Sequence, residues 1–481
     1  MLQCQRRFWL EVYRPDLKQD SRQTELKFRT GNQVGDLARH IFDPKGIGHL
    51  IDIKKEGYEQ AFFRSQQLLR GVDPIFEAGL TGGGVFAFAD VMLPGQRSAS
   101  WNMIEVKSST SVKDYHRDDI AIQTYAARSS GVEIESVSLA HIDSSWTYPG
   151  NQDYEGLLKV NDLTKDALSR HEEVAEWVKQ AQSIAKSSTE PTTCMGNQCT
   201  SPFECGFITH CSEGAEIIEF PVKWLPHINA KKVTELEASG ITDLREVPNG
   251  KLTDLQLRVK HASISGKPYF DAQGALNDLS NHPRPCLFLD FESVQFGVPI
   301  WPGTRPYQQI CFQFSLHRIG ANDDLEHTEF LDLSGSDPSE AFAKSLIKAC
   351  GDGTESIFVF NATFEKTRIS ELASKFPNLQ TELQRINNRI VDLMPITKNR
   401  FYHPSQEGSW SIKKVLPALV PELKYSDLDG VQDGNMAVAA YLEAIASDTS
   451  SDRKIEIEQQ LRKYCELDTY SMVRIWQAFS K

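Results

Sequence analysis

The residues most suited to chemistry in the N-terminal half are two carboxylates and a lysine in short apolar segments. Glu105 and Lys107 stand two apart in WNMIEVK, and Asp90 ends the earlier segment VFAFAD. Residues i and i+2 of an extended strand point to one face, so Glu105 and Lys107 project together and Asp90 can reach the same place. Two carboxylates can hold Mg²⁺ or Mn²⁺, which acidifies a water near a scissile phosphate while a lysine orients the hydroxide. The alternative is a plain charge pair on an exposed strand.

A second set of polar residues follows the same logic in the C-terminal half. Asp290 and Glu292 stand two apart in the apolar segment LFLDFES. Tyr464 and Asp468 stand four apart in a predicted helix, where they share one face. Carboxylates from separate elements can hold two divalent ions that clamp the attacking and leaving oxygens of an in-line displacement. Further candidates near apolar runs are Asn361, Glu365 and Asp392. The alternative is a catalytically inactive domain that serves in binding or assembly.

The cysteines form a third pattern. Four of the nine crowd into one short stretch, namely Cys194, Cys199, Cys205 and Cys211, and Cys4 lies at the opposite end of the N-terminal half. Zinc sites usually contain cysteine pairs two to four residues apart. The wider spacing here, with one distant partner, fits an iron–sulfur cubane held by four thiolates. A 4Fe-4S cluster is therefore expected, with zinc as the alternative.

Positioning these residues requires more than one core. A chain of 481 residues is too long for one ordinary core, so two domains with connections are expected. Residues 1–215 show helical patterns and then strand-like runs, residues 216–282 show two short amphipathic patterns, and residues 283–481 alternate strand-like and helical stretches. The middle region, hinged at Ser239 and Gly240, resembles a helix–hairpin–helix element, and a plain helical linker is the alternative. The fold class is expected to be α/β.

Composition and charge exclude several classes of protein. Hydrophobic residues make up 40% and charged residues 24%, which is typical of a globular protein, and no apolar run approaches the length needed to cross a bilayer. The first residues lack the apolar core of a signal peptide, so a cytoplasmic protein without a membrane partner is expected. The net charge of -13 argues against a general polyanion-binding surface but allows a local basic groove. Arg305 and Tyr307, in an aromatic-rich segment, are the expected nucleic-acid contacts.

The order of elements in the N-terminal half resembles a known nuclease family. An apolar strand ending in Asp90, a tight connection, a strand ending in Glu105-Val106-Lys107 and a helix carrying Gln123 are similar to the PD-(D/E)xK nucleases. The similarity is to the RecB-like branch, which includes the iron–sulfur exonucleases of CRISPR adaptation. It implies a restriction-endonuclease-like fold in which Asp90 and Glu105 bind the cation while Lys107 and Gln123 are catalytic. The secondary motifs of that branch fall on His40, Glu77 and Tyr125. Its cluster ligands fall on Cys4, Cys199, Cys205 and Cys211, which leaves Cys194 as a bystander.

The order of motifs in the C-terminal half resembles the DnaQ-like exonucleases of the ribonuclease H fold. Their motifs are DxE, an asparagine followed by a phenylalanine–acid pair, and YxxxD, here Asp290 to Glu292, Asn361 to Glu365, and Tyr464 to Asp468. The resemblance implies divalent-metal ligands at Asp290, Glu292, Glu365 and Asp468. It also implies that Tyr464 positions the water and that Asp392 is an auxiliary aspartate. Glu365 departs from the family, which usually has aspartate at that position.

Over nearly its whole length the chain resembles a bacterial family that joins these two nuclease modules. That family starts with a short segment before its first cysteine, so a strand or turn upstream of Met1 is expected. The expected function is that of a metal-dependent DNA exonuclease acting on single strands or ends, in repair or in defence against foreign DNA. The alternatives are an RNA-processing nuclease and a nucleic-acid-binding scaffold with an inactive C-terminal domain.

Overall fold

The chain divides into two compact units, each of mixed α/β structure. The computed structural model describes residues 1–213 and 218–481, and the boundary expected between residues 215 and 216 lies outside the described residues. The first unit contains residues 1–215 with 296–308, and the second unit contains residues 216–295 with 309–481. No helix in the described part of the chain has the length and apolar character needed to cross a membrane.

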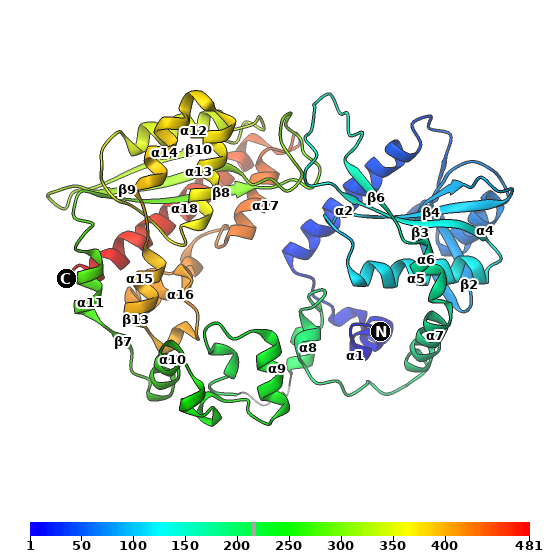
Figure 1. Cartoon of the computed structure of the whole chain (residues 1–481), viewed down its shortest axis with the longest axis horizontal. Helices are drawn as coiled ribbons and strands as arrows, with labels where there is room; N and C mark the ends of the chain where they lie inside the picture. The colour runs from blue at the N-terminus through cyan, green and yellow to red at the C-terminus, as the bar shows by residue number, and fades with distance from the viewer. Residues whose placement is uncertain (214–217) are drawn as a thin grey trace. The chain divides into compact units, whose positions relative to one another are not determined.

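The first unit is built on a six-stranded sheet whose strands lie side by side in sequence order (Figure 1). The strands are β1 (His49–Leu50), β2 (Ile75–Gly82), β3 (Val85–Pro94), β4 (Ser100–Lys107), β5 (Glu133–Ile142) and β6 (Leu158–Asp162). Neighbouring strands pair antiparallel except β1 with β2 and β4 with β5, which are parallel. Helix α5 (Asp114–Ser129) supplies the crossover that the parallel β4–β5 pair requires.

Helices complete the core of the first unit. Besides α5 they are α1 (Gln5–Tyr13), α2 (Arg22–Phe42), α3 (Ile53–Glu56), α4 (Tyr58–Leu68), α6 (Thr164–Ser169), α7 (His171–Ala185) and α8 (Ile208–Ser212). Trp101 and Met103 of β4 are buried in one cluster with Ile120 of α5. Residues two apart on a strand share a face, so Glu105 and Lys107 continue the face of β4 that α5 covers.

The two ends of the main segment of the first unit lie together. Leu10 of α1 packs with Cys205 and Phe207 in a small apolar cluster. The Gln3 side-chain nitrogen Nε2 donates to the carbonyl oxygen of Gln198 at 2.7 Å. The segment that contains the first cysteine is thereby held beside the segment that contains the clustered cysteines.

The second unit is built on a five-stranded sheet with the order β10-β9-β8-β11-β12. The strands are β8 (Cys286–Val294), β9 (Ile310–Ile319), β10 (Leu325–Leu331), β11 (Ile357–Val359) and β12 (Ile390–Asp392). The pairs β8–β9 and β9–β10 are antiparallel, whereas β11 is parallel to both β8 and β12. The DxE motif therefore lies on the central strand, which has a hydrogen-bonded neighbour on each side.

The central strand β8 directs alternate residues to two different cores. Leu287, Leu289 and Phe291 belong to a cluster shared with α12 (Ser339–Cys350), α13 (Thr363–Lys375) and α14 (Gln380–Arg389). Phe288 belongs to the other cluster, which contains residues of the long C-terminal helix α18 (Ser451–Phe479). Asp290 and Glu292 follow Phe288 at two-residue intervals, so their side chains lie on the same face of the strand as Phe288, which is the face that α18 covers. Figure 1 shows α18 in red, close to β8 and β9.

The region predicted to resemble a helix–hairpin–helix element contains only one full helix of the expected pair. Helix α9 (Ala230–Ala238) ends before Gly240, which has a φ of +78°. The next element is the three-residue 3-10 helix η4 (Leu244–Glu246), and a full helix, α10 (Asp254–Ser265), starts only later. Pro248 follows η4 almost immediately and cannot donate the hydrogen bond that a longer helix needs.

The other elements of the second unit support the sheet and α18. They are α11 (Ala272–Leu279), α15 (Leu393–Arg400), α16 (Ile412–Leu419), α17 (Gly434–Ala444) and the two-stranded pair of β7 (Tyr269–Phe270) with β13 (Phe401–Tyr402). The aromatic residues Phe312 and Phe314 of β9 are fully buried, so they serve the core.

The connection between β8 and β9 belongs to the first unit, although the sequence places it inside the predicted C-terminal domain. Residues 296–308 form this loop. Two backbone hydrogen bonds join it to Tyr148. The Tyr148 nitrogen donates to the carbonyl oxygen of Thr304 at 2.9 Å, and the Gly303 nitrogen donates to the carbonyl oxygen of Tyr148 at 2.8 Å. The Tyr307 ring packs into a cluster around Val34, and its hydroxyl donates to the carbonyl oxygen of Ser108.

We expect the loop to stabilise the first unit through Tyr307. Tyr307→Ala should lower the local stability of this unit by about 2–4 kcal/mol, because it leaves a cavity beside Val34 and removes the bond to Ser108. Hydrogen exchange should then be faster at the amide of Ile142, which bonds to the carbonyl of Ser109. Ile300→Ala is the matched control, because Ile300 lies in the same loop and is 43% exposed. Equal exchange in the two variants would contradict this role.

Candidate functional site

The acidic site of the first unit forms where β2, β3 and β4 lie side by side. Glu77 and Asp90 face each other across the β2–β3 pair, between the paired residues Phe76–Val91 and Ala78–Ala89. Glu77 has a φ of +58°, which is uncommon for a residue with a side chain and interrupts the ladder at this point. Asp90 accepts a hydrogen bond from the backbone nitrogen of Val106 at 2.6 Å, which ties it to the Glu-x-Lys strand.

Lys107 is held between two carboxylates. Its Nζ lies 2.6 Å from Glu105 Oε1 and 2.6 Å from Asp119 Oδ2. Gln123 Nε2 donates to the other oxygen of Glu105 at 2.8 Å. Asp119 and Gln123 stand one turn apart on α5 and therefore reach the same strand. The sequence analysis did not identify Asp119, and its only signal is the four-residue spacing from Gln123.

Burial shifts the proton equilibria of these acids. Burial, with the nearby Glu77 as the next cause, raises the pKa of Asp90 to about 7. Burial also raises the pKa of Glu105 well above its ordinary value, with Asp90 as the next cause. For Lys107, burial opposes the charge, but Glu105 and Asp119 outweigh it and raise the pKa. The Lys107 ammonium acts on three carboxylates, those of Asp90, Glu105 and Asp119, so negative groups outnumber the lysine charge at this point.

The secondary residues expected near this site differ in where they lie. Glu77 is close to it, as described above. His40 is exposed on α2, and the charged side chains of α2 that act on the pKa of Glu77 are Arg39 and Asp36. Tyr125 is directed to the carbonyl of Gly83 instead, at 3.4 Å. Residues two apart on a helix do not share a face, so Gln123 and Tyr125 cannot both face Glu105.

The cysteines near both ends of the first unit line one pocket. Its walls include Arg6 and Arg7 together with all the expected ligands and the fifth thiol, namely Cys4, Cys194, Cys199, Cys205 and Cys211. Burial raises the pKa of Cys205 and of Cys211, while the arginines oppose this rise. The thiols and the neighbouring positive charge suit an anionic thiolate cluster.

The spacing of the thiols bears on the choice between a cluster and zinc. A tetrahedral zinc site has Zn–S bonds of about 2.3 Å, so its four sulfurs lie close together. Among the described residues, these sulfurs form no group within 4.8 Å of one another. The cysteines are therefore not arranged as a compact metal site, and their spacing shows neither an iron–sulfur cluster nor zinc at the pocket.

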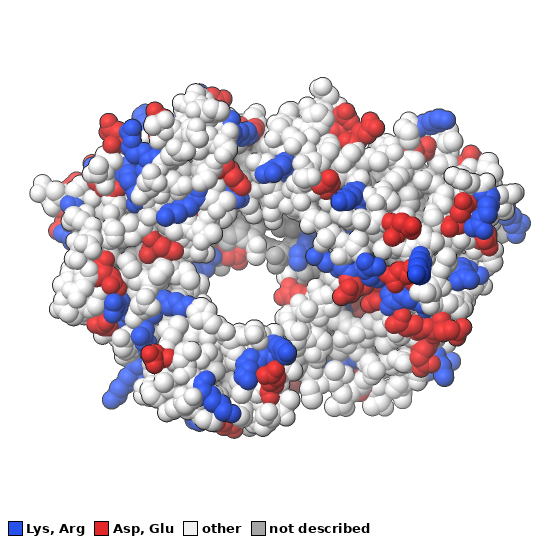
Figure 2. Space-filling model, in the orientation of Figure 1, with Lys and Arg blue, Asp and Glu red and all other residues white. Residues whose placement is uncertain are grey.

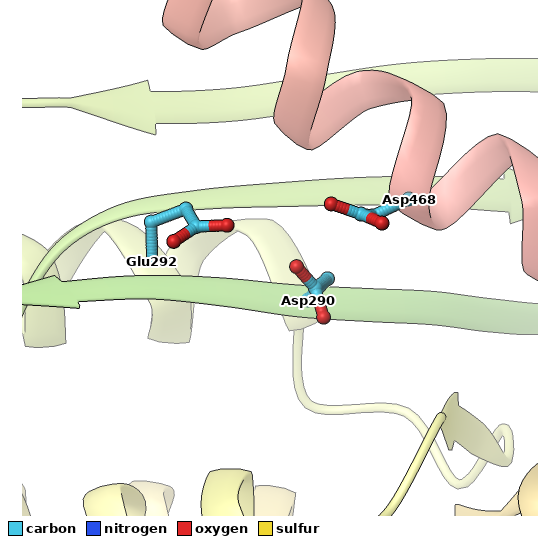
Figure 3. Close-up of side chains that lie close together, drawn as sticks. All are labelled: Asp290, Glu292 and Asp468. Atoms are coloured by element: carbon cyan, nitrogen blue, oxygen red, sulfur yellow. The ribbon is translucent and has the colours of Figure 1, made fainter. Parts of the chain in front are cut away.

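The acidic site of the second unit brings three carboxylates together (Figure 3). Oxygens of Asp290, Glu292 and Asp468 all lie within 4.8 Å of one another, the closest such group in the described part of the chain. Asp290 and Glu292 point from β8 and Asp468 points from α18 toward them. Three oxygen donors of this kind fit a hard divalent cation such as Mg²⁺ or Mn²⁺.

Two tyrosines and a lysine border these carboxylates. The Tyr425 hydroxyl donates to Asp468 Oδ1 at 2.6 Å. Tyr464 lies one turn before Asp468 on α18, and Lys413 Nζ lies 5.2 Å from the ring centre of Tyr425 and 5.1 Å from that of Tyr464. The sequence analysis missed Tyr425, because it stands in the short 3-10 helix η8 (Tyr425–Asp427) and reaches the site only through packing.

Glu365 lies beside this group without joining it. Its side chain is 3% exposed, and one of its oxygens, Oε2, has no hydrogen-bond partner in the described structure. Burial raises the pKa of Glu365 to about 8, and Asp392 adds to the rise. Asp392 itself accepts hydrogen bonds from the backbone nitrogens of Asn361, Ala362 and Met394, each at 3.0 Å. Asp392 therefore shapes the β11–α13 turn, in which Asn361 has a φ of +78°.

Burial dominates the electrostatics of the second site as well. It raises the pKa of Asp290 well above its ordinary value, and Asp468 and Glu365 add to the rise. It raises the pKa of Glu292 in the same way, with Asp468 as the next cause. Burial raises the pKa of Asp468 to about 6, although Tyr425 and Lys413 oppose this. Desolvation is therefore the largest cause of the raised pKa at each of these three acids.

The two expected nucleic-acid contacts have different environments. Arg305 is exposed, and its backbone nitrogen donates to Gln308 Oε1 at 3.0 Å. Tyr307 is occupied by the packing and the bond to Ser108 described above, which leaves little of its ring free for stacking on a base.

Comparison with known proteins gives two matches. Residues 287–411 match a family model described as a domain of unknown function, DUF2779. A relative described as "Uncharacterized protein MG366", from Mycoplasma genitalium, is 26% identical over 211 residues, or 39% of this chain. The match covers 31% of the length of that relative. No solved structure matches the chain significantly.

Glu365 should make the folding stability of the second unit depend on pH when a chelator keeps metal away. Its pKa is raised by folding to about 8, so the folded unit holds a proton that the unfolded chain has lost. The stability that this proton provides is lost as pH rises from about 5 to about 8. With a chelator present, Glu365→Gln should therefore have a higher melting temperature than the parent. The difference should grow as the pH rises from about 5 to about 8, to the order of 5 °C. Glu326→Gln, an exposed change on β10, is the control. A difference that is constant with pH would contradict the assignment.

Proposed function

We propose that the chain is a metal-dependent nuclease, and most specifically a DNA exonuclease whose second unit hydrolyses phosphodiesters. The observation that carries this proposal is the convergence of three carboxylates, Asp290, Glu292 and Asp468, within 4.8 Å at the centre of the second unit. Burying like charges beside one another is unfavourable unless a cation balances them. Their position on a central strand and on the helix that covers it supports a ribonuclease H-like, DnaQ-type assignment.

Each side chain at this site then has a distinct task. Asp290 and Glu292 hold divalent cations from the sheet, Asp468 holds them from α18, and Glu365 can approach from the start of α13. Bound Mg²⁺ or Mn²⁺ supplies acidified water and neutralises charge on the phosphate. Tyr464 orients the attacking water. Tyr425 fixes one oxygen of Asp468 through its hydrogen bond.

The first unit is proposed to contain a second hydrolytic site of the PD-(D/E)xK, RecB-like kind. Asp90 and Glu105 hold the divalent cation, and Gln123 orients Glu105 by its hydrogen bond. Lys107 acts on the water after it separates from the carboxylate of Asp119. The support is the arrangement of Asp90 and Glu105 around one lysine on the face of β4 that α5 covers.

Nucleic acid is the proposed substrate, with DNA preferred over RNA and single strands or ends as the part recognised. Figure 2 shows lysines and arginines interspersed with acidic residues on the face drawn, so the proposal rests on single basic side chains near the sites rather than on a broad basic surface. Lys413 is the lysine that neighbours the acidic group of the second unit, and it can oppose the charge of a bound phosphate. A role in repair or in defence against foreign DNA, in the cytoplasm, follows as part of this proposal.

A 4Fe-4S cluster is proposed on Cys4, Cys199, Cys205 and Cys211. Its support is that these thiols, from opposite ends of the first unit, line one pocket beside Arg6 and Arg7. The cluster would join the N-terminal segment to the segment after α7, and its role would be structural.

A digestion panel tests the nuclease proposal. Purified protein with Mg²⁺ or Mn²⁺ should degrade single-stranded DNA, duplex DNA or structured RNA. Asp290→Asn should remove the activity of the second unit and Lys107→Ala that of the first, each by about a hundredfold or more. The double variant should be inactive, and Glu326→Gln, an exposed change on β10, should match the parent.

Three outcomes would contradict the proposal. Full activity in the double variant would assign the cleavage to other residues or to a contaminant. Binding of nucleic acid by the parent without any metal-dependent cleavage would favour the alternative of a nucleic-acid-binding scaffold. A strong preference for structured RNA over every DNA would favour the alternative of an RNA-processing enzyme.

Iron content tests the cluster separately. Protein purified without oxygen should be brown and should contain about four irons per chain. Cys205→Ser should lose the iron and the colour, because the Cys205 thiol lines the pocket from a buried position. Cys194→Ser is the matched control, since Cys194 lines the same pocket but is exposed, and it should keep the iron. Stoichiometric zinc without iron would overturn the assignment.

A further inference from the structure

Strand β9 contains a row of three polar residues that the proposed chemistry does not use. Gln313 and Ser315 are fully buried and His317 is 3% exposed. They stand two apart, so they share one face of the strand. We call them the β9 polar column.

The column lies beside the DxE motif. In the antiparallel register, Gln313 is opposite Glu292 and Ser315 is opposite Asp290. Directly opposed residues of an antiparallel pair point to the same side of the sheet. The column and the two carboxylates therefore share the side that α18 covers.

Every member of the column is hydrogen-bonded to α18. Gln313 Nε2 donates to the carbonyl oxygen of Leu461 at 3.0 Å. The Ser315 hydroxyl lies 2.7 Å from Thr469 Oγ1, and His317 Nδ1 lies 2.8 Å from the same oxygen. Thr469 is fully buried and directly follows Asp468 in the chain.

These contacts bracket the catalytic part of the helix. Leu461 and Thr469 are separated by eight residues, or about 12 Å along a helix axis. Tyr464 and Asp468 both lie in this interval. One contact holds the helix before Tyr464, and two hold it immediately after Asp468. Together they fix the position of this helical segment along its axis and its rotation about that axis, relative to β9.

A polar interface of this kind needs a reason, because apolar packing between a helix and a sheet is at least as stable. Buried polar groups destabilise a fold unless they are paired, so a buried polar network is retained for the arrangement that it specifies rather than for stability. In this network the Gln313 Nε2, Ser315, His317 and Thr469 groups are paired, while Gln313 Oε1 has no hydrogen-bond partner in the described structure. His317 adds no charge to the interface, since burial lowers its pKa to about 4. What the network specifies is the register of α18 over β8 and β9.

We propose that the β9 polar column and Thr469 are positioning residues for the acidic site of the second unit. Resting on the proposed function, this inference assigns them the task of placing Asp468 within ligand distance of Asp290 and Glu292. They do not touch the substrate or the cations. A metal site requires its ligands to be held within a fraction of an ångström, and the column provides that constraint from strand β9, directly beside the DxE motif.

Direct binding of Mn²⁺ tests the proposal without relying on cleavage. All variants in this experiment are made in the whole chain with the added substitution Glu105→Gln, so that the acidic site of the first unit does not contribute to Mn²⁺ binding. Free Mn²⁺ is measured by electron paramagnetic resonance during titration. Thr469→Val, which keeps the shape of the side chain, should weaken Mn²⁺ binding about fivefold or more, because the hydrogen bonds that place Asp468 are lost. Thr469→Ser should restore the affinity.

Thr397→Val is the matched control. Thr397 is fully buried in the same unit, and its hydroxyl donates to the Leu393 carbonyl within its own helix, α15. It should lower the melting temperature like Thr469→Val while leaving the Mn²⁺ affinity within about twofold of the parent. Ser315→Ala serves as the test if Thr469→Val does not fold, and its affinity should fall in the same direction.

The outcomes separate this inference from the function on which it rests. If Thr469→Val and Ser315→Ala are less stable but bind Mn²⁺ as the parent does, the column is merely structural and the inference is wrong. If Asp290→Asn binds Mn²⁺ as well as the parent does, or if the parent does not bind Mn²⁺, the proposed metal site is wrong, and the inference is wrong with it. Weaker binding in the column variants, with normal binding in Thr397→Val, supports both.

Discussion

The burial of like charges beside one another is the constraint on which both units depend. In each unit, carboxylates are removed from water, and desolvation is the largest cause of their raised pKa values. A fold retains such groups only if rigid elements force them together and a cation can balance them. The sheets, the crossover helix α5 and the long helix α18 can be understood as the means of holding that arrangement.

The two units meet this constraint in different ways. In the first unit a lysine of the chain itself, Lys107, lies between Glu105 and Asp119, so the metal-free site already has an internal counter-charge. In the second unit the nearest lysine, Lys413, lies over two aromatic rings and forms no ion pair with the carboxylates among the described residues. The carboxylates of the second unit are therefore balanced less directly by the chain itself, and β9 and α18 hold them together by packing and hydrogen bonds.

Local spacing predicted the parts of these sites that lie within one element. The two-residue spacing of Asp290 and Glu292 placed them on one face of a strand, and the structure brings Asp468 to them from a predicted helix. Spacing could not predict partners that come from another element. The ion pair of Lys107 with Asp119, the bond of Tyr425 to Asp468 and the course of residues 296–308 all depend on how elements pack. Family motifs predicted Tyr125 near the first site, but α5 directs its hydroxyl to the carbonyl of Gly83, because residues two apart on a helix do not share a face. His40, predicted in the same way, is exposed on α2.

The path of the chain through the two units has a consequence for how the protein is made. The first unit is left at residue 215 and is completed only by residues 296–308, whose Tyr307 enters the cluster around Val34. A ribosome must therefore translate β8, with both acids of the DxE motif, before the first unit can close. Vectorial synthesis cannot finish one unit and then begin the other. For the same reason a gene divided at the apparent boundary would encode an N-terminal product without part of its own core.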